Sequence, residues 1–458
     1  MPRSPLLERA FAPVDIASIA CFRIVFGAVM AWEVVRYFQH GWIASSFIQP
    51  EFHFTYFGFG WVKPWPGGGM YVHFVVLGLA ALGVMAGLFY RVSAVLFFLA
   101  FVHVFLIDEA YYLNHFYLIS LVAFVMIFVP AHRAFSLDAR RCPALRSDVA
   151  PAWALWLLRA QVGIPYFYGG LAKINRDWLR GEPIGSWLAD RTDFPLIGPF
   201  FTHEWAGLAF AYGGLILDLT IVPLLLWKRT RPYAFAAGLL FHGLNAMLFD
   251  IGIFPWMMIA AFLLFFEPDW PRRIRWRPPA ASPRREPDLM PKPPRARLTV
   301  AAIAVYLAVQ ALLPLRHFAY PGNVSWTEEG HFFAWHMKLR DKDASARFVV
   351  KDADTGETWT SSPRAYLTRR QAERMAGHPD MILQFAHHLA RLARDAGRPH
   401  VEVRAITSAA VNGRERQTLL DPDIDLAAQT RTLWPAAWIV PLRQPLRKAP
   451  RAAAPVEE

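Results

Sequence analysis

Apolar segments alternate with short polar ones along the first 315 residues. A bilayer core is crossed by about 17 to 25 mostly apolar residues in one helix. Segments of about that length predict roughly nine spans, at 15–37, 69–90, 92–107, 116–130, 151–171, 205–227, 232–250, 252–267 and 298–315. The pattern therefore indicates a mainly α protein built on a polytopic membrane helical bundle at residues 1–315.

The pattern changes to that of a water-soluble α+β domain from about residue 316. The stretch ARFVVKDADTGETWTSS alternates apolar and polar residues around a turn signal and predicts a β-hairpin. RQAERMAGHPDMILQFAHHLARLARDAG has helical periodicity and predicts one helix that ends at Gly397. HVEVRAITSAAVNGRERQTLLDP predicts a strand, an Asn-Gly turn and a second strand. We therefore expect an extramembrane α+β domain at 316–445, followed by a disordered tail at 446–458.

Charge sets the predicted orientation. The chain has 458 residues, is 55% hydrophobic and carries a formal net charge of +12. Its basic residues gather between apolar segments, which indicates membrane topology and contact with lipids rather than nucleic acid. The basic segments 131–150, 228–232 and 268–297 are predicted to be cytoplasmic, the last as a Pro-rich linker. This orientation places the N-terminus inside and the 316–445 domain outside.

Cysteine usage predicts neither a disulfide framework nor a metal site. Cys21 lies in an apolar segment and Cys142 in a basic loop, and no Cys/His spacing matches a metal site. The N-terminal sequence also lacks the pattern of a cleavable signal peptide.

Several polar residues interrupt the apolar segments, where ionisable groups are candidates for function. Asp108, Glu109, Asn114 and His115 fall in one short turn that is predicted to face outside. Two interpretations fit them: a polar turn in which Asn114 and His115 begin the next helix, or part of a site.

A second polar group lies in the predicted spans 205–227 and 232–250. His242 and Asn245 are three residues apart and so share one helix face, either as an interhelical hydrogen bond or as the wall of a pocket. We expect Asp218 to have a packing role within the bundle. The same role is expected for Gln161 and Arg159 in the preceding span.

Lys173 ends the apolar stretch GIPYFYGGLAK. A lysine at a helix end often extends its amine to water. A water-poor aromatic environment, here including Tyr166 and Tyr168, instead disfavours the ammonium and makes a neutral amine available as a base. The predicted topology places this helix end on the same outer side as 108–115 and 242–250, as a single outward-facing site requires.

The residues described above recur in a known family, so the chain resembles vitamin K-dependent γ-glutamyl carboxylases, which contain the HTTM membrane domain. The resemblance runs from about residue 15 to about residue 443. It rests on LGLAALGVMAGLFYRVSAVLFF, LNHFYL, LRAQVGIPYFYGGLAKINRDWLRGEP, GGLILDL, FHGLNAMLFDIGIFPWMM, PDWPRR, WTEEGHFFAWHMKL and LLDPDIDL, in that order.

The resemblance implies a reaction and a set of site residues. Lys173 would deprotonate vitamin K hydroquinone, of phylloquinone or menaquinone type, and the product with O₂ would be a strongly basic alkoxide. That base would remove a γ-proton from a glutamyl side chain in a peptide or protein, and CO₂ would add. His115 and His242 would share the active site. The implied contacts to the cofactor are Asn114, Asn245, Tyr166, Tyr168 and Trp256.

The sequence also departs from the family pattern. The family has tandem lysines where this chain has Ala172-Lys173, and the paired cysteines of its outer domain have no counterpart. A long region that follows in members acting on secreted substrates is also missing. These features, with the Arg/Ala/Pro-rich composition, predict a bacterial inner-membrane protein with its site facing the periplasm. Two alternatives are a quinol epoxidase without peptide carboxylation and a non-catalytic scaffold or transporter. The scaffold predicts random loss of the polar set, which is complete here.

Overall fold

The computed structural model describes residues 4–249, 251–274 and 289–446, and the protein is mainly helical. The long helices are α2 (Ala17–Gln39), α3 (Gly69–Ala86), α4 (Tyr90–Ile107), α5 (Asn114–Phe128), α7 (Ala152–Lys173), α9 (Glu204–Leu226), α10 (Arg231–Leu248), α11 (Phe254–Phe262), α13 (Pro293–Leu312) and α16 (Pro379–Asp395). The shorter ones are α1 (Pro5–Phe11), α6 (Leu137–Arg141), α8 (Ile184–Ala189), α12 (Trp270–Ile274), α14 (Val324–Thr327) and α15 (Arg369–Ala376). The strands are β1 (Pro13–Asp15), β2 (Val149–Pro151), β3 (Lys342–Asp352), β4 (Thr358–Ser361) and β5 (Val401–Val411).

Each of the nine segments predicted to span the membrane contains a helix, from α2 to α13. Five helices of the described residues are long and apolar enough to cross a bilayer: α2, α3, α4, α9 and α13 with the turn after it. Helices α5 and α11 are apolar but shorter. Helices α7 and α10 contain charged and polar residues, among them Lys173 and His242, which lower their hydropathy. The described residues therefore make a membrane protein with five clear spans, and the total of nine stays a prediction.

The surface of the helical bundle that faces away from its own core is apolar. Leu79 on α3, Ile216 on α9 and Val305 on α13 are 62%, 59% and 64% exposed. Large apolar side chains at this exposure on several helices are typical of a surface in contact with lipid rather than water.

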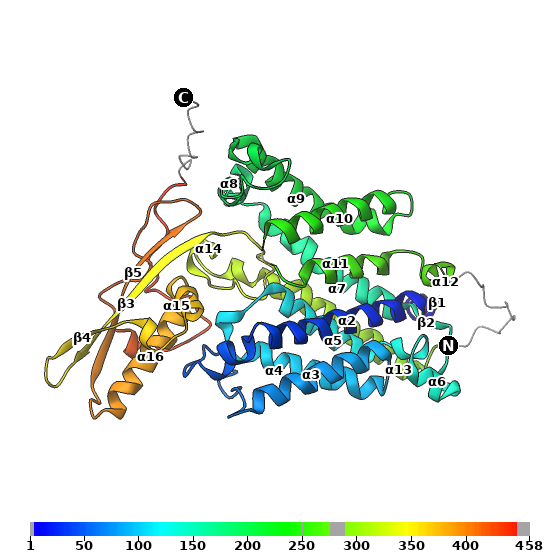
Figure 1. Ribbon diagram of the computed structural model, residues 1–458, viewed down its shortest axis with the longest axis horizontal. Coiled ribbons are helices and arrows are strands. Elements are labelled where there is room, and N and C mark those ends of the chain that lie inside the picture. The colour runs from blue at the N-terminus through cyan, green and yellow to red at the C-terminus, as the bar shows by residue number, and fades with distance from the viewer. Residues whose placement is uncertain (1–3, 250, 275–288, 447–458) are drawn as a thin grey trace.

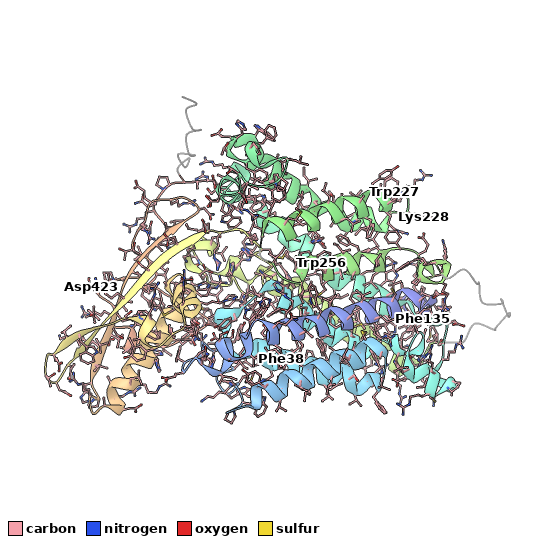
Figure 2. All side chains as sticks on the ribbon, in the orientation of Figure 1. Phe38, Phe135, Trp227, Lys228, Trp256 and Asp423 are labelled. Atoms are coloured by element: carbon pink, nitrogen blue, oxygen red, sulfur yellow. The ribbon has the colours of Figure 1, made fainter. Side chains whose placement is uncertain are left out.

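The two ends of the bundle differ. Figure 1 shows the N-terminus, the β1–β2 pair, α6 and α12 at one end, and β3–β5 with α15 and α16 at the other. In Figure 2, Lys228 likewise lies far from Asp423 of the C-terminal domain. The basic segments expected to be cytoplasmic therefore gather opposite the C-terminal domain. Part of the expected linker (275–288) and most of the expected disordered tail (447–458) lie outside the described residues.

The C-terminal domain is a three-stranded antiparallel sheet in the order β4-β3-β5, packed against α16. The predicted hairpin is confirmed, with Lys351 paired to Thr358. After the Asn-Gly turn, Gln417 makes only an isolated bridge, so the predicted second strand is wrong.

The prediction of one continuous helix before Gly397 is also wrong. The chain forms α15 and α16, separated at Gly377 and His378. Pro379 is the first residue of α16, where its missing N–H does no harm. A proline inside a continuous helix would clash with the preceding turn. Pro379 also favours extended backbone at the residue before it, and His378 has φ −119°.

The outer turn 108–111 joins the bundle to the C-terminal domain. Asp108 accepts a hydrogen bond of 2.7 Å from the side-chain amide of Gln371, and Glu109 accepts one of 2.6 Å from Gln384. Asp108 also caps the turn itself through the N–H of Ala110. Both acids are thus engaged in holding the two parts of the protein together.

The segment 328–340 of the C-terminal region enters the bundle. Trp335 is 1% exposed, and its ring lies 4.8 Å from that of Tyr117 on α5, measured between centroids. Four non-glycine residues of the segment have left-handed backbone: Glu328 (φ 63°), Phe333 (φ 63°), Trp335 (φ 59°) and Lys338 (φ 54°). Such conformations are sparsely populated, and they persist where the surrounding packing enforces them. We call residues 328–340 the inserted segment.

Candidate active site

Lys173 lies at the C-terminal end of α7, and its amine is buried. Nζ donates a hydrogen bond of 2.5 Å to Oδ2 of Asp218 on α9 and one of 3.3 Å to the carbonyl of Gly169. The two side chains are 7% and 4% exposed. Lys173 therefore does not extend to water, and Asp218 is its partner rather than a general packing residue.

Small residues and an indole surround the Lys173 side chain. Its Nζ lies 5.2 Å from the ring centroid of Trp178, over the ring face. A methyl group added at Gly214 would lie 3.9 Å from Lys173 Cε, and one added at Gly169 would lie 2.8 Å from the Met337 methyl. Gly169 thus leaves room for the Met337 methyl group of the inserted segment, which a larger residue at this position would displace.

Tyr166 and His242 form a second buried pair beside the first. The Tyr166 hydroxyl is 2.6 Å from Nε2 of His242, and Tyr166 lies within electrostatic range of Asp218. His242 is 1% exposed, and its Nδ1 has no partner among the described residues. If the hydroxyl donates to Nε2, the ring proton resides on Nδ1, which becomes a free donor.

His115 and Asn114 join this group from α5. The rings of His115 and His242 both lie 5.8 Å from that of Phe254, measured between centroids. Asn114 is the first residue of α5, and its side chain accepts from the Tyr112 hydroxyl (3.0 Å) and donates to the carbonyl of His336 (3.2 Å). Asn114 therefore connects the start of α5 to the inserted segment.

His336 and Trp335 bring unpaired nitrogen atoms to the site. Both ring nitrogens of His336 and Nε1 of Trp335 are buried without a partner in the described part of the chain. Burial, followed by the charges of His317, Arg340 and Lys173, lowers the pKa of His336 to about 3. His336 is therefore a neutral ring near Lys173. No local sequence signal connects His336 to Lys173, because the two residues lie more than 150 positions apart along the chain.

Three predicted contacts lie outside this buried group. The Tyr168 hydroxyl donates to the carbonyl of Ala311 on α13. Asn245 donates to the carbonyl of Phe241 on its own helix, at 2.8 Å. The Trp256 indole is 52% exposed. In this conformation none of the three has its polar group among the buried residues, and their contact with a cofactor stays a prediction.

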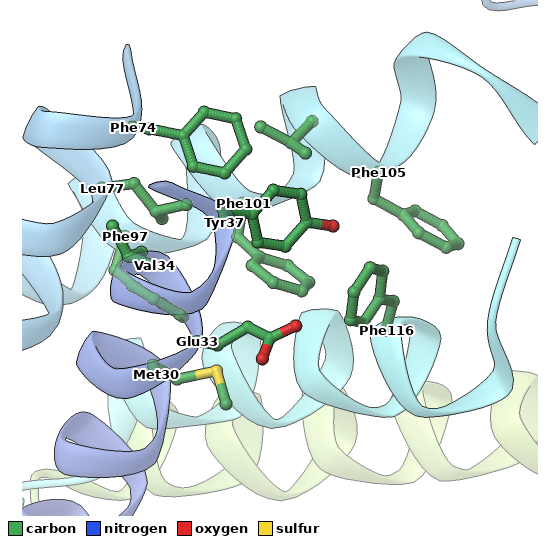
Figure 3. Close-up of a pocket in the computed structure, with 11 residues that line it drawn as sticks. Met30, Glu33, Val34, Tyr37, Phe74, Leu77, Phe97, Phe101, Phe105 and Phe116 are labelled. Carbon is green, nitrogen blue, oxygen red and sulfur yellow. The ribbon is translucent and has the colours of Figure 1, made fainter. Parts of the chain in front are cut away.

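A further buried charge lies close to His115. Glu33 on α2 is 7% exposed and pairs with Arg36 at 2.7 Å, and Arg36 lies within electrostatic range of His115. Figure 3 shows Glu33 and Tyr37 beside a cavity of about 20 Å³. The phenyl groups around this cavity are those of Phe74, Phe97, Phe101, Phe105 and Phe116. The sequence signal for this pair is an acid followed by an arginine three residues later inside an apolar span, a signal absent from the predicted site.

A cluster of charged groups lies where the inserted segment meets the C-terminal domain. The Glu328 carboxylate is 2.9 Å from Arg340, 3.3 Å from Lys342 and 3.5 Å from His378. Burial, with Arg340 as the first of several cations, lowers the pKa of His331 well below its usual value. Burial and the neighbouring Arg374 do the same for His378. Both rings are therefore neutral at physiological pH.

The buried side chains around Lys173 and His242 can bind a small polar ligand. Unpaired nitrogens on His242, Trp335 and His336 require partners that no described residue provides, since buried polar groups are nearly always paired. The described residues contain no group of three His, Cys, Asp or Glu side chains that could hold a metal ion. An organic ligand bearing oxygen atoms fits the donors that are present.

Two known protein domains match the chain. The HTTM domain matches residues 11–270, and the lumenal domain of vitamin K-dependent gamma-carboxylase matches residues 295–445. No solved structure matches the chain. The first match alone covers more than half of the 458 residues, and the second follows it in order. The chain therefore belongs to the vitamin K-dependent gamma-carboxylase family of HTTM-domain membrane proteins.

Proposed function

We propose that this protein carboxylates glutamyl side chains at the γ-carbon, using vitamin K hydroquinone, O₂ and CO₂. The observation that carries the proposal is the buried Lys173–Asp218 pair, which lies beside unpaired nitrogens of His242 and His336. When bound, the hydroquinone reacts with O₂ and supplies the base that removes the glutamyl γ-proton. The residues of the chain bind it, start the reaction by removing a proton and exclude water.

Lys173 is the proposed base. Its amine accepts the proton of a quinol hydroxyl, and Asp218 stabilises the ammonium as it forms, through a charge-assisted hydrogen bond of 2.5 Å. A carboxylate that supports a catalytic imidazole acts in the same way. No cationic neighbour is present at Ala172, so the carboxylate partner and burial together set the balance between amine and ammonium.

The other buried residues orient the quinol and exclude water. His242 offers Nδ1 to one quinol oxygen while Tyr166 holds Nε2. His115 packs against Phe254 and offers a second ring. The inserted segment covers the site with the Trp335 and Met337 side chains, which keep a strong base away from bulk water.

The proposed orientation follows from where the parts of the chain lie. The basic ends of the bundle would face the cytoplasm, and the site and C-terminal domain would face the periplasm of a bacterial inner membrane. The lipid-soluble quinol would enter from the bilayer, and a glutamate-containing peptide would enter from the side of the C-terminal domain. The parts 1–315 and 316–445 would act as one catalytic unit.

One assay tests the proposal. Purified protein receives reduced vitamin K, O₂, labelled bicarbonate as the source of CO₂ and a short glutamate-containing peptide, with Lys173→Ala as the control variant. We expect both quinone epoxide and label in the peptide, and neither with the variant. Epoxide without label would refute carboxylation and identify a quinol epoxidase. Absence of epoxide with both proteins would refute quinol chemistry and leave a non-catalytic membrane protein.

A further inference from the structure

A groove on the lipid-facing side of α3 and α4 contains polar residues where the bilayer would lie. It has a volume of about 710 Å³ and runs between the two helices. Its apolar walls include Val72 and Leu99, which are 64% and 57% exposed. One end of the groove holds His73 and His103, whose rings are 4.9 Å apart between centroids.

The two histidines and Trp65 form one connected group. The Trp65 indole donates to Nδ1 of His73 at 3.1 Å, and Nε2 of His73 is 2.9 Å from the carbonyl of Ala100. Trp65 also stacks on His103, with 5.3 Å between ring centroids. His73 is thus fully paired, whereas Nδ1 of His103 is buried with no partner in the described chain. A buried polar atom without a partner is unfavourable unless a ligand engages it.

The loop before α3 places a cation at the same end of the groove. Lys63 is exposed, and its backbone lies beside the ring of His103. It has no carboxylate partner among the residues that the structure describes. Trp61 and Trp65, on either side of Lys63, are 76% and 52% exposed. Tryptophan is enriched at the depth of lipid headgroups, so these neighbours put Lys63 at that depth.

We propose that this groove binds an anionic phospholipid. The phosphate pairs with Lys63, a headgroup hydroxyl donates to Nδ1 of His103, and one acyl chain lies between Val72 and Leu99. An apolar groove that ends in a cation and a free acceptor matches an amphipathic anion with a hydroxylated headgroup. The inference does not depend on the proposed reaction, because the groove lies on helices other than those that carry Lys173, Asp218 and His242.

Photolabelling of the full chain tests the site. Protein in nanodiscs is exposed to phosphatidylglycerol with a photoreactive acyl chain, and labelled peptides are mapped by mass spectrometry. We expect label on α3 and α4 within the groove. Lys63→Ala should lower it about fivefold, the fold-change for the roughly 1 kcal/mol that one basic residue contributes at an anionic surface. His103→Leu removes the hydrogen-bond acceptor and should lower the labelling of the groove by a larger factor than Lys63→Ala does.

The controls separate recognition from general lipid contact. Lys228→Ala removes an exposed lysine at the opposite end of the bundle and should leave groove labelling unchanged. Label on the exposed face of α13 should be equal in all variants, and gel filtration verifies that each is folded. Three results would overturn the proposal: wild-type labelling in both groove variants, equal labelling by phosphatidylcholine, or loss of labelling on addition of soluble glycerol phosphate.

Discussion

Lys173 on α7 and Asp218 on α9 share a buried hydrogen bond of 2.5 Å. The pair joins two helices that are distant in sequence and places a carboxylate beside the only lysine of the buried group. Its energetics differ from those of a lone lysine in an apolar pocket. Burial disfavours the charged pair, whereas the carboxylate stabilises the ammonium.

Replacing Lys173 tests whether the amine must become neutral. Lys173→Arg keeps the positive charge beside Asp218, but a guanidinium is not deprotonated in proteins. We expect quinol epoxidation to fall by a factor of about 10² to 10⁴, the usual contribution of a positioned base. The measurement is epoxide formation at saturating quinol. Wild-type turnover in this variant would exclude Lys173 as the base.

Asp218→Asn tests the stabilisation of the ammonium. A hydrogen bond to a charged group contributes about 1.5–3 kcal/mol, so we expect kcat to fall about ten- to a hundredfold. The acidic limb of the pH–rate profile should move to lower pH, because the ammonium loses its counter-charge. Asp177→Asn is the matched control, since it breaks a buried pair with Arg414 (2.7 Å) that does not include the Lys173 amine. A profile that moves equally in both variants would contradict the assignment.

The two tyrosines of α7 form a matched pair. Tyr166→Phe leaves Nε2 of His242 unpaired and frees its tautomer, so we expect the KM for quinol to rise about tenfold or more. Tyr168→Phe removes a hydroxyl that donates to the Ala311 carbonyl and not to His242, so it should raise that KM less. Equal effects of the two changes would show that the Tyr166–His242 contact does not orient the quinol.

The neutral histidines beside Glu328 make stability depend on pH. The folded pKa of His331 and of His378 is depressed, so below about 6.5 the unfolded chain binds protons that the folded protein does not. The free energy of unfolding should therefore fall as pH drops from 7 to 5, by up to about 1.4 kcal/mol per pH unit for each ring. Thermal unfolding of His378→Gln should show a shallower slope. His400→Gln changes an imidazole that is 71% exposed and should keep the wild-type slope.

Trp335 tests the packing of the inserted segment. Trp335→Ala removes a buried indole, and a change of this kind lowers the free energy of unfolding by about 3–5 kcal/mol. Trp434→Ala, at a position that is 81% exposed, should change it little. Thermal unfolding in one detergent compares the two. Similar midpoints for both variants would mean that the inserted segment contributes little to stability.

The sequence predicted the helices better than the contacts between them. Apolar length identified the helices α2 to α5, α7, α9 to α11 and α13, because burial in lipid imposes a pattern along the chain itself. A proline signal was present at Pro379, but the periodicity on either side of it concealed the break. Asp218 was assigned to packing, since its pairing with Lys173 depends on how α7 lies against α9. The approach of His336 depends in the same way on a domain that begins after the bundle ends.

The left-handed residues of the inserted segment bear on how this protein could be divided or recombined. Phe333, Trp335 and Lys338 pack against the bundle, which holds their backbone. An isolated C-terminal domain would expose Trp335 and Phe333 to water and release this conformation. A bundle alone would lose the ring of His336 and one wall of its site. Chimaeras between relatives should therefore exchange the inserted segment together with the bundle residues it touches, and the boundary should lie after Arg340.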